Sequence, residues 1–134
     1  MKTLLVADDE PANIALIRMI VEDSGLEVRL VTAATGDEAL AHARALVPDL
    51  ILMDLKMRVL DGWEATRRLK ADDRTKAIPV VAVTGHALAG HSEGAKRAGC
   101  DSFVTKPCLP DQLLAEVKRM LELNKKGQRA RSGS

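Results

Sequence analysis

The sequence predicts an α/β domain built around a mostly parallel β-sheet. Short apolar runs rich in Val, Leu and Ile alternate five times with stretches whose apolar residues recur every three or four positions. This alternation is typical of βαβ units, in which helices connect parallel strands. A length of 134 residues suits one domain with a substantial core, and we place that domain at residues 1–124.

Three strands and two helices are expected in the first half of the chain: strands near 3–7, 27–31 and 50–54, and helices near 12–24 and 36–47. Pro11 suits the first turn of a helix, where its missing N–H costs nothing. Leu16 and Ile20 share the apolar face of the helix that follows. Gly25 and Gly99 suit helix C-caps, because glycine adopts the left-handed conformation found there.

Two strands and three helices are expected in the second half: strands near 79–84 and 102–105, and helices near 63–71, 88–98 and 110–124. The last helix is clearly periodic, with apolar residues at Leu113, Val117 and Leu121. The helix near 88–98 is the weak element, because Gly90 and Gly94 each cost about 1 kcal/mol relative to alanine. We expect this helix to be mobile.

The last ten residues differ in composition from the rest of the chain. They carry four basic residues without an acid, namely Lys125, Lys126, Arg129 and Arg131, and little to bury. We expect residues 125–134 to be a disordered basic tail, whose composition is compatible with residues added for expression. Without that tail, 16 basic and 19 acidic residues leave the domain at −3. An acidic domain is a poor ligand for DNA, so we expect no DNA binding.

Other compositional features exclude several classes of protein. Trp63 and Phe103 are the two aromatic residues, too few to stack the bases of a single strand. Cys100 and Cys108 are too few for a disulfide scaffold. No signal peptide or apolar stretch of membrane-spanning length is present. The sequence therefore predicts a cytoplasmic protein with reduced thiols and no membrane contact, either a monomer or a weak homodimer.

Polar residues follow four of the expected strands, at the point where each strand ends. Asp8 and Asp9, Asp54, Thr84 and Lys106 each come directly after an apolar run. The carboxyl ends of parallel strands meet at one edge of an open α/β sheet, and ligands bind at that edge. We therefore expect three carboxylates, a hydroxyl and an ammonium to converge on one site.

Three carboxylates gathered at one edge need a cation. Two such groups about 4 Å apart repel each other by about 4 kcal/mol at an effective dielectric constant near 20. Magnesium is the natural partner, because this hard ion takes carboxylate, carbonyl, water and phosphate oxygens. The constellation of side chains favours a magnesium-assisted site where a phosphoryl group is placed on a carboxylate.

The motifs at these positions resemble those of the receiver domains of two-component response regulators, up to about residue 124. They are ADDE at 7–10, MDLKM at 53–57, DG at 61–62, VTGHA at 83–87 and FVTKP at 103–107. The resemblance implies a flavodoxin-like, doubly wound (βα)5 sandwich with a parallel five-stranded sheet in the order 2-1-3-4-5. It also implies a signalling module rather than an enzyme, with a histidine kinase or a histidine phosphotransfer protein as phosphodonor and a downstream protein as partner.

The resemblance assigns a role to each residue of the site. Asp54 is the residue phosphorylated in this family, and it binds Mg²⁺ (or Mn²⁺) together with Asp8, Asp9 and the backbone carbonyl at the position of Lys56. Thr84 would bond a phosphoryl oxygen in the active state, and Lys106 would pair with another. A carboxylate nucleophile forms an acyl phosphate, and a metal ion with an ammonium balances the charge on the transferring group.

The same resemblance implies a conformational switch, in which Thr84 moves toward the phosphoryl group and Phe103 turns inward. The output surface would comprise the fourth helix, the fifth strand and the fifth helix. Many family members have Tyr where this chain has Phe103, so the inward state here lacks a hydroxyl that could form a hydrogen bond. Arg58 replaces a frequent proline, which leaves its loop less constrained. Lys106 and Pro107 match a bond that is cis in the family.

Two further functions are expected outside this constellation. Lys56 and His86 lie two residues after Asp54 and Thr84 respectively, and the resemblance to receivers implies that these positions face each other across the phosphoryl group. We therefore expect them to cover the path of hydrolytic water and set the lifetime of the acyl phosphate. Ile14, Arg18 and Val21 form a helix stripe distinct from Leu16 and Ile20. This stripe is either the edge of a wide core face or the docking surface for the four-helix bundle of a kinase. Trp63 is expected to pack in the protein rather than to bind a ligand.

Three other classes, namely an enzyme, a flavin carrier and a receiver segment of a larger kinase, stand beside the stand-alone receiver, which is favoured because nothing after residue 124 resembles an output domain. A magnesium-dependent phosphatase with an aspartate nucleophile would need a second Asp where this chain has Lys56, and a nucleotide hydrolase would need a P-loop, which is absent. A flavin carrier would need aromatic partners for its ring. The chain also resembles receiver segments of hybrid histidine kinases, through the DDE motif followed by Asn13.

Overall fold

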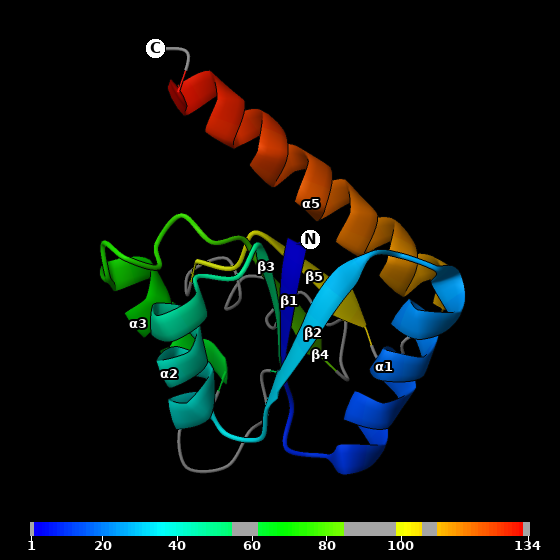
Figure 1. Cartoon of the computed structure of the whole chain (residues 1–134). Helices are drawn as coiled ribbons and strands as arrows, with labels where there is room; N and C mark the ends of the chain where they lie inside the picture. The colour runs from blue at the N-terminus through cyan, green and yellow to red at the C-terminus, as the bar shows by residue number, and fades with distance from the viewer. Residues whose placement is uncertain (1, 55–61, 85–98, 106–109, 133–134) are drawn as a thin grey trace.

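The protein folds into a five-stranded parallel β-sheet with helices on both of its faces (Figure 1). The structure is a computed structural model, and it describes residues 2–54, 62–84, 99–105 and 110–132. The strand order is β2-β1-β3-β4-β5, and each neighbouring pair is parallel. Both the fold class and the strand order predicted from the sequence are confirmed.

The strands are short and stop at the same edge of the sheet, the lower edge in Figure 1. They are β1 (Lys2–Ala7), β2 (Val28–Ala33), β3 (Leu50–Asp54), β4 (Val80–Thr84) and β5 (Ser102–Thr105). Four of them lie within one residue of the expected ranges at each end. The second was expected near 27–31 and instead extends to Ala33, because it pairs with β1 through the register of Ala7 with Ala33.

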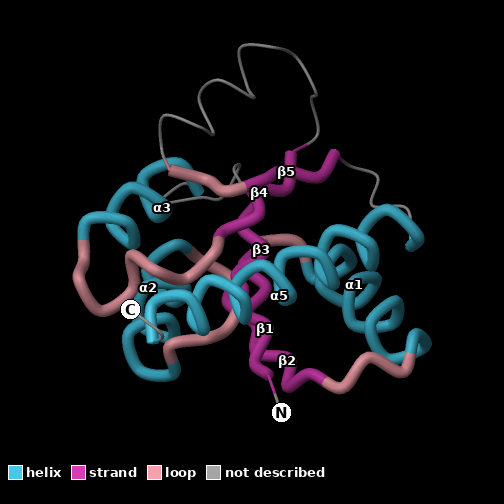
Figure 2. Tube along the Cα trace, turned by 90° about the horizontal axis from the view of Figure 1, so that it is seen from above, coloured by secondary structure: helices cyan, strands magenta, loops and turns pink. Residues whose placement is uncertain are grey.

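Four helices are described: α1 (Pro11–Ser24), α2 (Gly36–Leu46), α3 (Gly62–Ala71) and α5 (Pro110–Ser132). Seen along the strands, α1 and α5 cover one face of the sheet and α2 and α3 cover the other (Figure 2). Pro11 is the first residue of α1, and Gly25 ends that helix in the left-handed conformation with φ 75°. The helix expected near 88–98 lies outside the described residues, while Gly99 does have a positive φ of 101°.

The last helix is longer than the sequence predicted. We expected it to end near residue 124 and residues 125–134 to be disordered, whereas α5 continues to Ser132 and projects past the amino edge of the sheet (Figure 1). Lys, Arg, Gln and Ala are good helix formers, and adding a residue to a formed helix needs no new nucleus. The helix thus extends eight residues beyond the expected bound, and the expectation that residues 125–134 form a disordered tail stays a prediction.

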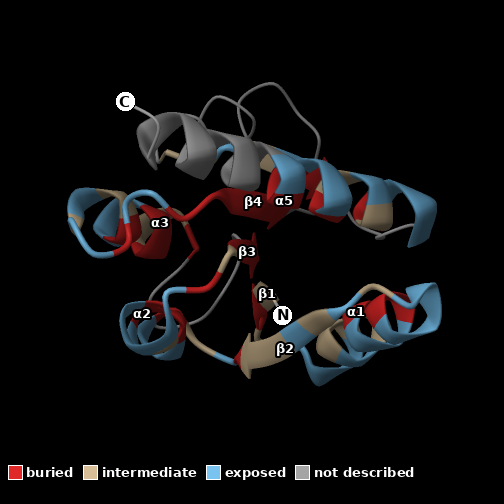
Figure 3. Cartoon of the chain, turned by 45° about the horizontal axis from the view of Figure 1, so that its top comes forward, coloured by how far each residue is buried: buried red, intermediate tan, exposed pale blue. Residues whose placement is uncertain are grey.

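The core consists of two apolar layers, one on each face of the sheet. Alternate residues of each strand point to opposite faces, so Leu4 and Leu52 pack toward α1 and α5, while Leu5 and Met53 pack toward α2 and α3. The central strands β3 and β4 are buried and the edge strand β2 is largely half-buried (Figure 3).

Within the described ranges, no helix is both long enough and apolar enough to cross a membrane.

Candidate functional site

The turn after β1 holds Asp8 in a defined orientation at the carboxyl edge of the sheet. The backbone N–H of Asp8 donates to the carbonyl oxygen of Ala33 at 2.9 Å, which extends the pairing of β1 with β2 by one residue. Its carboxylate oxygen Oδ1 accepts the backbone N–H of Glu10 at 2.9 Å. Aspartate commonly forms such a turn with the N–H two residues further on, and here the turn leads directly into α1.

The first three predicted metal ligands lie together. Ala7 pairs with Met53 in the parallel register, so the residues that follow them, Asp8 and Asp54, lie side by side. One carboxylate oxygen from each of Asp8, Asp9 and Asp54 lies within 4.8 Å of the others. Asp8 and Asp54 are buried, with 2% and 3% of their surface exposed, and Asp9 is half-buried.

The chemistry of this cluster fits a divalent cation. Three carboxylates in one partly buried site repel one another and lose hydration. All three offer hard oxygen ligands, which Mg²⁺ prefers, and the ion would offset both costs. Lys56, whose carbonyl was expected to complete the ligand set, lies outside the described residues.

The polar residues of the other strand ends are described only in part. Thr84 is the last residue of β4, one position beyond Val83, which pairs with Asp54, and it is paired with Thr105 at the end of β5. The backbone of Thr84 therefore lies at the same edge as the carboxylates. Lys106, His86 and Arg58 lie outside the described residues, so their predicted roles stay predictions.

The expected switch residue lies at the surface. Phe103 is the second residue of β5, and 39% of it is exposed. On the α3 side of β4, Trp63 is half-buried and packs against Ala82 with Cys100, as expected for a packed helix residue. Burial raises the pKa of the Cys100 thiol, which disfavours its reactive thiolate.

The three residues of the helix stripe expected to dock a kinase differ in burial. Val21 is 3% exposed and belongs to the core between α1, the sheet and α5. A buried residue cannot form part of a docking surface, so Val21 is corrected to a core residue. Ile14 is half-buried against the same core, and Arg18 is exposed.

A groove that was not predicted from the sequence begins at the carboxylates and follows α1. It has a volume of about 430 Å³ and is lined by residues of α1, of the turn before it and of the segment after β2: Asp8, Asp9, Pro11, Ile14, Ala15, Arg18, Met19, Glu22 and Ala34. Met19 could have revealed this groove from the sequence. It is an apolar residue next to the charged Arg18, and it lies off the core face formed by Ile17 and Ile20.

The chain belongs to the response regulator receiver domain family. The model of this family, described as the response regulator receiver domain, matches residues 4–118. Proteins of this family act in phosphorelay signalling, with histidine kinases or phosphotransfer proteins as partners. The class predicted from the sequence is therefore confirmed, and the phosphatase alternative is not favoured.

Individual relatives agree with this assignment. The polar-differentiation response regulator DivK of Brucella anthropi is 37% identical over 120 residues, which cover 90% of this chain and 96% of that protein. Among solved structures, a CheY-like receiver domain protein from Methanospirillum hungatei JF-1 has a TM-score of 0.85 and 28% identity, covering 95% of this chain and 98% of that one.

A third relative bears on the metal. The receiver domain of a sensor histidine kinase from Pseudomonas aeruginosa PAO1 has a TM-score of 0.82 and 30% identity, covering 90% of this chain and 98% of that one. In that structure a magnesium ion is coordinated in the active site cleft. This chain has its acidic cluster at the carboxyl edge of an equivalent sheet.

Proposed function

We propose that this receiver accepts a phosphoryl group on Asp54 and holds Mg²⁺ with Asp8, Asp9 and Asp54. The observation that supports this proposal most is the convergence of the three carboxylates within 4.8 Å at the carboxyl edge of the sheet. Asp54 is the acceptor because it ends the central strand β3, between the turn that carries Asp8 and Asp9 and the end of β4. Mn²⁺ is expected to substitute for Mg²⁺, since it also takes oxygen ligands.

The proposed transfer is a displacement at phosphorus. A carboxylate oxygen of Asp54 forms a bond to phosphorus while the bond from phosphorus to an imidazole nitrogen of the donor breaks, and the imidazole keeps the electron pair. Bound Mg²⁺ would neutralise charge on the phosphoryl oxygens. The buried position of Asp54 keeps bulk water from competing for the phosphoryl group.

Two further residues complete the proposed site. Thr84 donates its hydroxyl to a phosphoryl oxygen and Lys106 pairs with another oxygen, which draws the ends of β4 and β5 toward Asp54. Lys56 and His86 cover the side from which hydrolytic water approaches, so they set the lifetime of the acyl phosphate. The backbone position of Thr84, one residue beyond the partner of Asp54, supports its role.

Phosphorylation is proposed to shift a pre-existing equilibrium between an outward and an inward position of the Phe103 side chain on β5. Phe103 is exposed in the structure, which suits the state before its side chain turns inward. Because phenylalanine has no hydroxyl, packing alone would hold the inward state. The surface formed by residues 88–98, β5 and α5 then becomes the binding site of the downstream protein partner.

The remaining proposals concern partners and location. Ile14 and Arg18 are proposed to contact the histidine kinase or phosphotransfer protein, since both line the groove that begins at Asp8 and Asp9. No DNA binding is proposed, because residues 1–124 carry a net charge of −3. A receiver that takes phosphate from a kinase is expected in the cytoplasm. The similarity to the Pseudomonas aeruginosa kinase receiver keeps a second proposal open, in which this chain is the receiver segment of a hybrid kinase.

The test is phosphorylation by acetyl phosphate, followed by intact mass. Wild-type protein with acetyl phosphate and Mg²⁺ should gain one phosphoryl group, excess chelator should suppress the gain, and Asp54→Asn should abolish it. Phosphorylation that persists at full rate in chelator would contradict the proposed metal site. A gain retained by Asp54→Asn would contradict the proposed acceptor.

A further inference from the structure

The groove along α1 is an apolar surface with charged residues on its rim. From Pro11 to Glu22 its lining spans about three helical turns, or about 16 Å at 1.5 Å per residue. Apolar residues make up most of the lining on α1, including Ile14, Ala15 and Met19. Met19 is the most exposed large apolar residue described, with 53% of its surface exposed. A flexible thioether side chain of this kind adapts readily to an opposing surface.

Two opposite charges flank the apolar lining. Arg18 and Glu22 both line the groove, both are exposed, and they lie one turn apart on α1. Neither side chain forms an ion pair within the described ranges, although residues four apart on a helix are neighbours. The order of the charges accounts for this, because an acid N-terminal to a base is the favourable orientation and here the base comes first.

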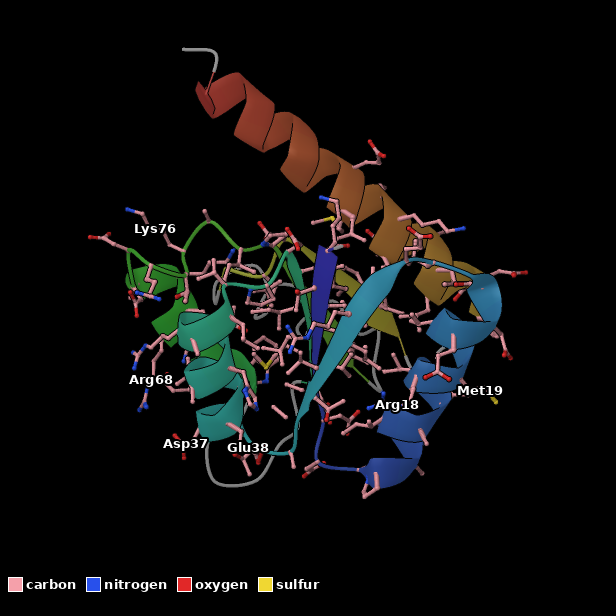
Figure 4. The ribbon with its side chains drawn as sticks, in the orientation of Figure 1. Arg18, Met19, Asp37, Glu38, Arg68 and Lys76 are labelled. Carbon is pink, nitrogen blue, oxygen red and sulfur yellow. The ribbon has the colours of Figure 1, made fainter. Side chains whose placement is uncertain are left out.

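This arrangement is self-complementary. In a pair of antiparallel helices related by a two-fold axis, every contact occurs twice with the copies exchanged. If two α1 helices pair in this way about an axis near Met19, Arg18 of each copy comes within one turn of Glu22 of the other. Both Met19 side chains then lie between the helices, over the apolar lining. Figure 4 shows Met19 at the outer side of α1 and Arg18 on the side toward β2, and both residues are exposed.

We propose that this face of α1 binds the same face of a second copy of the chain, as a weak antiparallel dimer. One helix face of about 16 Å cannot bury the area of a standard stable interface, about 800 Å² per partner. The dimer is therefore expected to form at high micromolar concentration or above. Formation of this dimer does not require phosphorylation, so the proposed dimer does not rest on the function proposed above.

The dimer has a consequence for the site. Its interface begins at the turn that carries Asp8 and Asp9, so a second copy on α1 occupies the approach that a phosphodonor would use. Self-association and docking of a phosphodonor on this helix are then mutually exclusive, whereas acetyl phosphate is small enough to reach Asp54 in either state.

Charge reversal tests the pairing directly. Sedimentation velocity of full-length wild-type protein, from about 20 µM to 1 mM, should show a concentration-dependent dimer. Arg18→Glu alone and Glu22→Arg alone should each weaken the association at least tenfold, because each places like charges opposite one another across the axis. An equimolar mixture of these two variants should associate as a heterodimer, and the double variant R18E/E22R should regain self-association.

Two controls separate the dimer from other effects. Arg68→Glu reverses the charge of an exposed i,i+4 pair on α3, where Arg68 Nε lies 3.5 Å from Glu64 Oε1, and should leave association unchanged. Met19→Asp should abolish association while the thermal unfolding temperature stays within a few degrees of wild type, since Met19 is not in the core. Equal sedimentation of wild type, both single variants and Met19→Asp would overturn the proposal, as would a double variant as weak as the single ones.

Discussion

The ammonium Nζ of Lys70 lies 2.9 Å from Oδ2 of Asp101, at the edge of the sheet opposite the carboxylate cluster. Lys70 Nζ also donates to the carbonyl oxygen of Ile78 at 2.7 Å, and the same Asp101 oxygen accepts the N–H of Val80 at 2.8 Å. This clamp ties the end of α3 to the starts of β4 and β5. Gly99 lies against it, because a Cβ there would approach Lys70 Cγ to 2.8 Å.

Removing the ammonium should therefore destabilise the domain. We expect Lys70→Met to lower the free energy of unfolding by about 1–3 kcal/mol, because the three oxygen atoms that accept from Lys70 Nζ lose a charged donor. Lys76→Met is the matched control, since its partner Asp73 is almost fully exposed, and should cost less than about 1 kcal/mol. Urea unfolding of both variants is the measurement. Equal costs would show that the Lys70 clamp is no stronger than a surface ion pair.

The carboxylate cluster should make the unfolding temperature depend on Mg²⁺. Asp9→Asn should unfold at the same or a higher temperature than wild type in chelator, because one source of repulsion is removed. Wild type should be stabilised by added Mg²⁺ through binding to the native state, and Asp9→Asn should lose most of this response. Asp37→Asn, at the exposed start of α2, should keep it. A full Mg²⁺ response in Asp9→Asn would place the metal elsewhere.

Val47 ends α2 in the left-handed conformation, with φ 45° and ψ 66°. A β-branched residue is strained there, whereas asparagine tolerates this region. Val47→Asn should raise the free energy of unfolding by about 1 kcal/mol, while Val47→Ala should gain less because alanine has no short polar side chain that can hydrogen-bond to the nearby backbone in this conformation. Val47 is 45% exposed, so little packing is lost. Thermal and urea unfolding that rank Val47→Asn below wild type would contradict this account of the cap.

The pKa of Asp72 is lowered, first by the hydrogen bond from the backbone N–H of Arg74 and then by Arg44. A carboxyl group whose pKa is lower in the folded state stabilises the protein above its unfolded pKa of about 3.9, and this stabilisation is lost as the pH falls through the folded value. Asp72→Asn should therefore be less stable than wild type at pH 7 and closer to it near pH 2.5. A constant difference between Asp72→Asn and wild type would contradict the assignment.

The sequence predicts the strand ends well because they depend on local composition. The run Leu50–Met53 is apolar and buried on both faces, so Asp54, which follows it and ends β3, lies at the sheet edge. The same reasoning placed Asp8 beside Asp54. The end of β2 was less predictable, since this edge strand is half-buried and its length depends on pairing with β1.

Helix faces were harder to predict. Val21 and Met19 are both apolar residues of α1, yet one belongs to the core and the other is exposed. Periodicity alone does not separate a wide core face from an exposed stripe, because the difference depends on where α5 packs against α1. The clamp at Lys70 likewise joins segments distant in sequence, so no local pattern predicts it.

The most direct test of the proposed function is to locate the acyl phosphate. Borohydride reduces an aspartyl phosphate to homoserine, so phosphorylated protein treated in this way and digested should carry a single homoserine, at position 54. If Asp54 is the magnesium-dependent acceptor, this product requires Mg²⁺ and Asp54→Asn yields none. Homoserine at Asp8 or Asp9 in the wild-type protein, or none at position 54 after full phosphorylation, would contradict it.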